Sequence, residues 1–232
     1  MARIKICGLF RDEDIDYANE AGPDYIGFVF APGRHQICPA RAARFRERLD
    51  KNIVPVGVFV NQAIDGIAAL FRDKVIGMAQ LHGDEDARYI RRLRESCGVP
   101  VIKVFRVERP YDPLPAAGEA ACLADYCLVD SGAGSGRTFD WKLLARPELS
   151  GDAVIRADSS LGESDSAPGA GFFAAVLKGR PWFLAGGIGL ENMEAALATG
   201  AYGIDVSSGA ETDGVKDREK MIQLVHLARK SL

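Results

Sequence analysis

Short apolar segments recur along the whole chain, and most of them end at a glycine or a polar residue. Most of these segments do not alternate apolar and polar positions, which is typical of parallel strands buried on both faces. The pattern therefore predicts strands at Ile4–Cys7, Tyr25–Phe30, Val54–Val60, Met78–Leu81, Val101–Val107, Tyr126–Val129, Trp182–Ala185 and Gly203–Val206.

Segments with apolar residues at helical spacing lie between these strands. Gly22 and Gly200 follow two such segments, and glycine is common just past a helix end. The stretch Ala21–Gly27 resembles Thr199–Asp205, and each indicates a helix end, a tight turn and a strand. The clearest helices are expected at Arg41–Leu49, Ala63–Arg72, Glu85–Arg94, Asn192–Thr199 and Arg218–Leu232.

This alternation predicts the fold class α/β, as a single (β/α)8 TIM barrel with a long loop between the sixth and seventh strands. The loop contains a Ser- and Gly-rich stretch, Gly151–Gly171, which we interpret as an insertion. A doubly wound open sheet is the rival architecture, but about eight units exceed a typical open sheet. We expect residues 1–232 to form one barrel domain.

Composition excludes several classes of protein. The chain of 232 residues has a net charge of −3 and no apolar run long enough for a membrane span, so we expect neither a nucleic-acid nor a membrane partner. Its start is charged rather than like a signal peptide. The five cysteines are odd in number and form no CxxC pair, which argues against a disulfide scaffold or a zinc ribbon. A reduced, cytoplasmic protein is expected.

Polar residues stand at the ends of several predicted strands. In a barrel of this class, reactive groups gather at the carboxyl ends of the strands. One such residue alone is more often a cap or a turn residue, but several that converge on one mouth indicate a site. The candidates are Cys7, Asn61, His82, Asp130, Asp205 and Ser207.

Two glycine-containing segments predict a phosphate site. Gly186 and Gly187 follow the seventh strand, and Ser207, Ser208 and Gly209 follow the eighth. Loops at these two places commonly bind phosphate through backbone N–H groups, which glycine allows to approach closely. The alternative is a pair of ordinary turns.

The segment Ser131–Thr138 nearly matches a nucleotide-binding P-loop. Ser131 replaces the first glycine of that motif and Arg137 replaces its lysine. We therefore favour a flexible active-site loop that closes over substrate.

Cys7 and Asp130 are the candidates for proton transfer. A neighbouring cation would lower the pKa of the thiol, and apolar burial would raise that of the carboxyl, so the pair could supply a general base and a general acid. Cys7 could instead be an inert buried cysteine. The other four cysteines are expected to be inert and buried, and His226 is expected to be structural or solvated.

An ordered set of motifs covers nearly the whole chain and resembles the phosphoribosylanthranilate isomerase family of tryptophan biosynthesis. Phe10 departs from this family, which usually has a small polar residue there, and Arg137 departs where lysine is frequent. The matching segments are Lys5–Leu9, Arg34–Pro39, Val56–Asn61, Gln80–Gly83, Asp130–Gly136, Thr138–Trp141, Leu184–Gly187, Asp205–Gly209 and Gly214–Asp217.

This resemblance implies an Amadori rearrangement of a small phosphosugar, N-(5-phosphoribosyl)anthranilate. It implies Cys7 as the general base, Asp130 as the general acid and Arg34 at the anthranilate carboxylate, with the phosphate held by the loops that follow the last two strands. We expect His82 and Asp205 to contact substrate; Asp205 could instead brace Arg34 or be purely structural. No metal or cofactor is expected, and the sequence does not indicate the oligomeric state.

Two rival functions stay open. A bifunctional histidine–tryptophan isomerase carries an aspartate in place of Cys7, so the cysteine argues against it. A barrel that binds phosphate without catalysis is disfavoured because both Cys7 and Asp130 are present.

Overall fold

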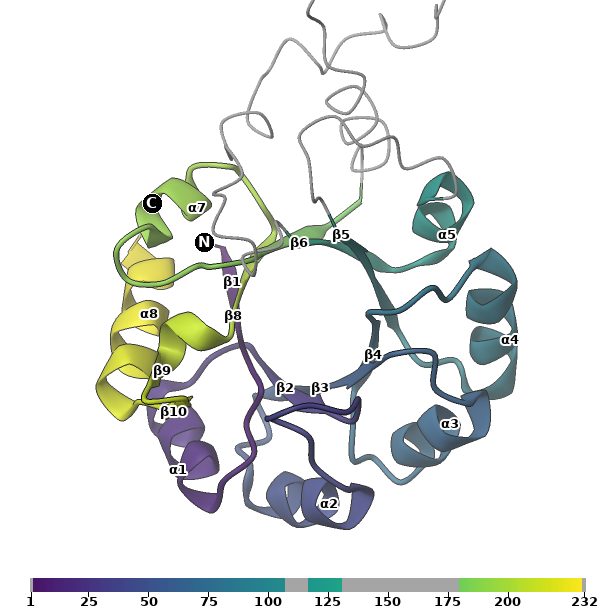
Figure 1. The fold of residues 1–232 in the computed structure, drawn as a ribbon, viewed down its shortest axis with the longest axis horizontal. Coiled ribbons are helices and arrows are strands. Elements are labelled where there is room, and N and C mark those ends of the chain that lie inside the picture. The colour runs from purple at the N-terminus through teal and green to yellow at the C-terminus, as the bar shows by residue number, and fades with distance from the viewer. Residues whose placement is uncertain (1, 107–116, 131–179, 231–232) are drawn as a thin grey trace, which may run out of the picture.

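The structure is a computed structural model that describes residues 2–106, 117–130 and 180–230. In it, eight parallel strands pair in chain order into a closed barrel, and helices surround the barrel on the outside (Figure 1). The predicted fold class is thereby confirmed. The expected flexible loop at Ser131–Thr138 and the insertion at Gly151–Gly171 lie outside the described residues.

The barrel strands agree with the sequence-based prediction to within one residue at each end. Continuous apolar runs identify them because one face of each strand packs inside the barrel and the other packs against helices. The strands are β1 Arg3–Cys7, β2 Tyr25–Val29, β3 Val54–Phe59, β4 Met78–Leu81, β5 Val101–Arg106, β6 Tyr126–Asp130, β7 Trp182–Ala185 and β8 Gly203–Val206.

The helices differ from the prediction more than the strands do. The sequence predicts the end of α1 at Gly22 but not its course, because Asp14, on its buried face, interrupts the apolar pattern. This carboxylate accepts hydrogen bonds from Phe10 N and Arg11 N. The expected C-cap Gly22 is correct, with φ 66° in the left-handed region. The helices are α1 Asp12–Ala21, α2 Pro39–Arg48, α3 Ile64–Arg72, α4 Ala87–Cys97, α5 Ala117–Leu123, α7 Met193–Leu197 and α8 Arg218–Lys230.

A short hairpin follows β8 and has no counterpart in the predicted elements. It begins after a 3-10 turn at Ser208–Ala210 and consists of the antiparallel strands β9 Glu211–Thr212 and β10 Val215–Lys216. Figure 1 shows it on the outside of the barrel, beside α1 and α8.

Two apolar clusters build the core. The larger lies between barrel and helices, and the smaller fills the barrel interior around Tyr25, Met78, Leu128 and Phe183. Because strand side chains alternate between two faces, the residues that face inward recur at every second position. Nearer the carboxyl ends of the strands the interior becomes polar, since buried Lys5, Gln80 and Asp205 occupy inward positions there.

The barrel closes where β1 pairs with β8. Lys5 lies opposite Asp205 in this register, and Ile6 lies opposite Val206. No helix among the described residues is long and apolar enough to cross a membrane.

Candidate active site

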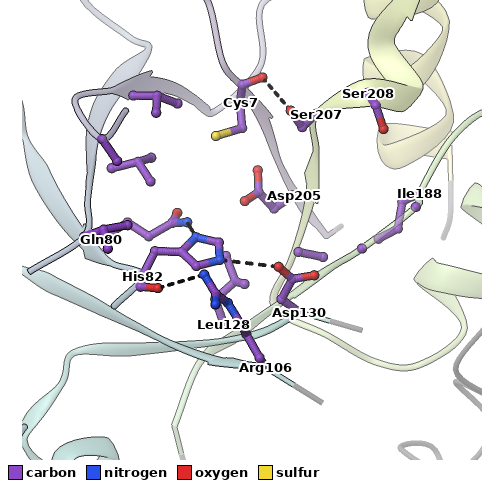
Figure 2. Close-up of a pocket in the computed structure, with 17 residues that line it drawn as sticks. Cys7, Gln80, His82, Arg106, Leu128, Asp130, Ile188, Asp205, Ser207 and Ser208 are labelled. Carbon is purple, nitrogen blue, oxygen red and sulfur yellow. Dashed lines mark hydrogen bonds and ion pairs between the residues drawn. The ribbon is translucent and has the colours of Figure 1, made fainter. Parts of the chain in front are cut away.

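A cavity of about 410 Å³ opens at the carboxyl ends of the strands (Figure 2). Five of the six strand-end candidates line it because all five occupy inward-facing positions. These are Cys7, His82, Asp130, Asp205 and Ser207. Its volume is in the range of small-molecule sites.

Asn61 is the strand-end candidate that does not line the cavity. Its φ of 51° is left-handed, and its backbone N–H donates to Glu85 at 2.7 Å. Its side-chain oxygen accepts from the Asp84 amide at 2.9 Å. Asn61 is therefore a turn residue, the ordinary role that its position also allowed.

Cys7 ends β1, and its buried side chain faces the cavity. Gly27 on β2 leaves room for the thiol, since a Cβ at that position would lie 2.5 Å from Sγ. Burial raises the pKa of Cys7, while the charge of the nearby Lys5 ammonium opposes that rise. The cation expected from sequence is thus present, but burial outweighs it in the empty site.

Asp130 ends β6 on the other side of the cavity and is partly exposed to it. His82 Nε2 lies 3.4 Å from Asp130 Oδ2, and Gln80 Nε2 lies 3.4 Å from His82 Nδ1. The next strand contributes Arg106, which is paired with Asp130 in the β5–β6 register and donates to the His82 carbonyl at 3.3 Å. The carboxyl group therefore contacts His82, which follows β4 and is in turn contacted by Gln80 of β4.

Asp205 lies between Cys7 and Asp130 in Figure 2. Its Oδ2 accepts a hydrogen bond from Lys5 Nζ at 2.8 Å, and both side chains are buried. Asp205 Oδ1 and Gln80 Oε1 are buried and have no hydrogen-bond partner among the described residues. Unpaired buried oxygens are costly, so two of them in one cavity indicate a ligand with hydroxyl or N–H groups.

The loops after β7 and β8 form the cavity wall beside Asp205. Gly186 and Gly187 have φ of 103° and 63°, conformations that favour glycine. Ser207 and Ser208 line the same wall, and the Ser207 hydroxyl donates to the Cys7 carbonyl at 3.3 Å. Gly209 does not line the cavity.

Arg34 lies outside the lining of this cavity. Its Nη2 donates to Glu211 Oε2 at 2.6 Å, and its side chain is 58% exposed. The carboxylate that braces Arg34 is therefore Glu211 of β9, not Asp205, whose ion pair is with Lys5. Glu211 Oε1 also accepts from Lys216 Nζ at 2.5 Å.

Sequence reasoning missed Lys5, Gln80, Arg106 and Glu211 as members of the site or its support. A usable signal exists for the first two. Each is a polar residue inside an apolar run, two positions before a strand-end candidate, and therefore on the same face of its strand.

A metal centre has no support among the residues that the structure describes, which contain no cluster of three or more His, Cys, Asp or Glu that could hold an ion. All five cysteines lie within the described ranges, and none is in a disulfide.

Comparison with known proteins decides the family. The sequence profile described as N-(5'phosphoribosyl)anthranilate (PRA) isomerase matches residues 4–157 and 168–227. The chain belongs to this PRA isomerase family. The profile leaves 158–167 unmatched, within the stretch interpreted above as an insertion.

Individual members of the PRA isomerase family match over nearly their whole length. The N-(5'-phosphoribosyl)anthranilate isomerase of Endomicrobium trichonymphae is 41% identical over 99% of each chain. The crystal structure of phosphoribosyl anthranilate isomerase from Thermus thermophilus has a TM-score of 0.72 at 32% identity and covers 98% of each chain. A third member, solved in complex with reduced 1-(o-carboxyphenylamino)-1-deoxyribulose 5-phosphate, has a TM-score of 0.73 at 28% identity over 99% of each chain.

Proposed function

We propose that this chain isomerises N-(5'-phosphoribosyl)anthranilate to 1-(2-carboxyphenylamino)-1-deoxyribulose 5-phosphate, with Cys7 as base and Asp130 as acid. The observation that carries the proposal is the placement of a thiol and a carboxyl group on opposite sides of one cavity, next to two glycine-containing loops. A substrate that spans this cavity can contact the acid and the base at the same time.

The first step opens the sugar ring. Asp130 donates a proton to the ring oxygen, and the bond between that oxygen and C1 breaks. The nitrogen lone pair of the anthranilate then forms a C=N bond to C1. His82 supports this step because it lies against Asp130 and orients the carboxyl group.

The second step moves a proton from C2 of the sugar to Cys7. The electrons of the C2–H bond form a C1=C2 bond, and the C=N electrons return to nitrogen, which gives an enolamine. The enol then loses its hydroxyl proton while C1 gains one, and the product is the ketone. Exchange with water restores the ionisation states of Cys7 and Asp130.

Binding follows from the two ends of the substrate. The phosphate is a dianion that suits the backbone N–H groups at Gly186 and Gly187 and the hydroxyls of Ser207 and Ser208, with Gly209 shaping the loop behind them. Asp205 Oδ1, which has no hydrogen-bond partner in the part of the chain that the structure describes, suits a sugar hydroxyl.

The aromatic ring of the substrate suits the opposite wall. Val58 and Val60 of that wall are apolar, and Val60 is 42% exposed although it is large and hydrophobic. Arg34 follows the wall residue Ala31 by three positions, and its planar guanidinium would pair with the anthranilate carboxylate. This reaction on a small phosphosugar needs no further partner; we place it in the cytoplasm and treat residues 1–232 as one catalytic domain.

Purified protein mixed with freshly made phosphoribosylanthranilate should accelerate the loss of substrate fluorescence. Cys7→Ser and Asp130→Asn should each lower kcat at least ~100-fold, the lower range for general acid–base groups. Cys97→Ser, in α4 and outside the cavity lining, should keep normal turnover. No acceleration by the unmodified protein would overturn the proposed function, and normal turnover in either site variant would overturn that role.

A further inference from the structure

A buried ion pair lies on the same inner face of the barrel as Cys7. Lys5 is fully buried inside the barrel, and its Nζ is 2.8 Å from Asp205 Oδ2. Lys5 and Cys7 are two residues apart on β1, so both side chains face the interior, and the positive charge of Lys5 acts on the sulfur. The single ammonium of β1 is thus paired with a carboxylate and lies on the same strand face as the thiol.

We propose that Lys5 is a positioning residue for Cys7: its ammonium, held in place by Asp205, stabilises the thiolate that removes the proton from substrate. This inference rests on the proposed role of Cys7 as the base. It assigns Lys5 a task that the buried pair alone does not explain, because replacing such a pair by apolar residues is often neutral for stability.

Three charged groups act on the Cys7 thiol from the elements packed around it. Lys5 on β1 and Lys216 on β10 favour the thiolate, and Asp205 on β8 opposes it. β2 contributes only Gly27 at this point. Lys216 is already engaged with the Glu211 carboxylate and the Ser207 carbonyl, and of the two cations Lys5 has the larger effect on the thiol.

Substrate binding strengthens the effect of Lys5. Asp205 uses one oxygen for Lys5, and its other oxygen faces the cavity without a partner among the described residues. A sugar hydroxyl that donates to this second oxygen draws negative charge away from Lys5. The ammonium then interacts more strongly with the sulfur at the moment when the base is needed.

The test is the pH dependence of Cys7 alkylation by iodoacetamide, measured on the full chain without substrate and read on the Cys7 peptide by mass spectrometry. In Lys5→Met the midpoint of the profile should rise by about one pH unit or more, and the rate at pH 7.5 should fall at least ~3-fold. The rate falls less than the thiolate fraction because a more basic thiolate is a better nucleophile. In steady-state kinetics, kcat of Lys5→Met should fall while KM changes less than ~3-fold. The acid limb of its kcat/KM pH profile should move to higher pH.

Lys103→Met is the matched control. Lys103 on β5 is also a buried lysine paired with a carboxylate, Glu85 at 3.1 Å, but it does not line the cavity. This variant should suffer a comparable loss of stability and leave the Cys7 alkylation profile unchanged. An equal shift in both variants would show a general effect of lost packing and overturn the inference.

If Lys5→Met does not fold, the comparison of Asp205→Asn with Lys5→Met/Asp205→Asn replaces it, since the double variant leaves no unpaired buried charge. The midpoint should be higher in the double variant than in Asp205→Asn. Equal midpoints would overturn the inference. The alkylation profile of Cys7 could depend on Lys5 in a protein that fails to isomerise phosphoribosylanthranilate. That result would support the effect of Lys5 on Cys7 and refute the proposed function.

Discussion

Gly209 allows the loops after β7 and β8 to touch. A Cβ on Gly209 would lie 2.0 Å from the Ile188 carbonyl oxygen, which is closer than any side chain allows. Both loops belong to the proposed phosphate site, so their contact determines the spacing of the donors.

Gly209→Ala should push these two loops apart. We expect KM for the phosphosugar to rise about 10-fold with a smaller change in kcat, since a phosphate contact binds ground state and transition state alike. Steady-state kinetics and inhibition by inorganic phosphate would measure this. Gly66→Ala, inside α3, is the control and should leave KM unchanged; an unchanged KM in Gly209→Ala itself would place the phosphate elsewhere.

The residues of the site differ in how well the sequence predicts them. Cys7 and Asp130 stand at the polar ends of apolar runs, where barrel geometry brings side chains to the mouth. Lys5 lies inside such a run, and a search limited to strand ends passes over it. The partner of Arg34 is beyond sequence reasoning because Glu211 is 177 residues away and in a hairpin with no apolar pattern.

At the scale of elements, the β9–β10 hairpin connects two parts of the site. Glu211 binds Arg34 of the β2–α2 loop and Lys216 of its own hairpin, and Lys216 Nζ donates to the Ser207 carbonyl at 3.0 Å. His35 Nε2 lies 3.0 Å from the same carboxylate. Glu211 therefore links Arg34, the proposed partner of the anthranilate carboxylate, to the loop proposed to bind the phosphate.

Glu211→Gln should weaken substrate binding both at the anthranilate carboxylate and at the phosphate. The substitution leaves the Lys216 ammonium buried without a countercharge, which costs about 3 kcal/mol of folding stability. KM should rise about 5- to 10-fold. Arg34→Ala, which removes the proposed contact with the anthranilate carboxylate, should also raise KM. Urea unfolding would report the stability of Glu211→Gln. A stability loss with normal KM would show that the hairpin supports the fold alone.

The strands were predictable, and the course of α1 before its expected end at Gly22 was not, for a common physical reason. Sequence patterns report burial of apolar side chains, and every barrel strand buries both faces. Helix α1 places a charged residue, Asp14, on its buried face and satisfies it with backbone N–H groups of Phe10 and Arg11. A capping interaction of this kind is visible only once the chain is folded.

At the scale of the whole molecule, buried thiols make the free energy of unfolding depend on pH in the alkaline range. Burial raises the pKa of Cys127 to about 11 from its ordinary value of 9.0. Between these values the unfolded chain loses the thiol proton and the folded chain keeps it, so stability is full below pH 9 and falls as pH rises toward 11.

Cys127→Ala should reduce this alkaline loss. Urea titrations at pH 8 and pH 10.5 give the free energy of unfolding at each pH. Between these two pH values it should fall by about 2 kcal/mol less in the variant than in the unmodified protein. The variant starts from a lower stability at pH 8 because it opens a small cavity, so the pH difference is the relevant quantity. Equal losses would assign the alkaline sensitivity to other groups.

The closure of the barrel by β1 and β8 has a consequence for how the protein comes into being. Lys5 and Asp205 are 200 residues apart in the chain, and Cys7 and Ser207 are equally distant. At roughly 10 residues per second, about 20 seconds of synthesis separate the two halves of this seam. A nascent chain therefore contains Cys7 well before Asp205 and Ser207 are synthesised. In refolding, catalytic turnover should return only when the last strand, β8, pairs with β1.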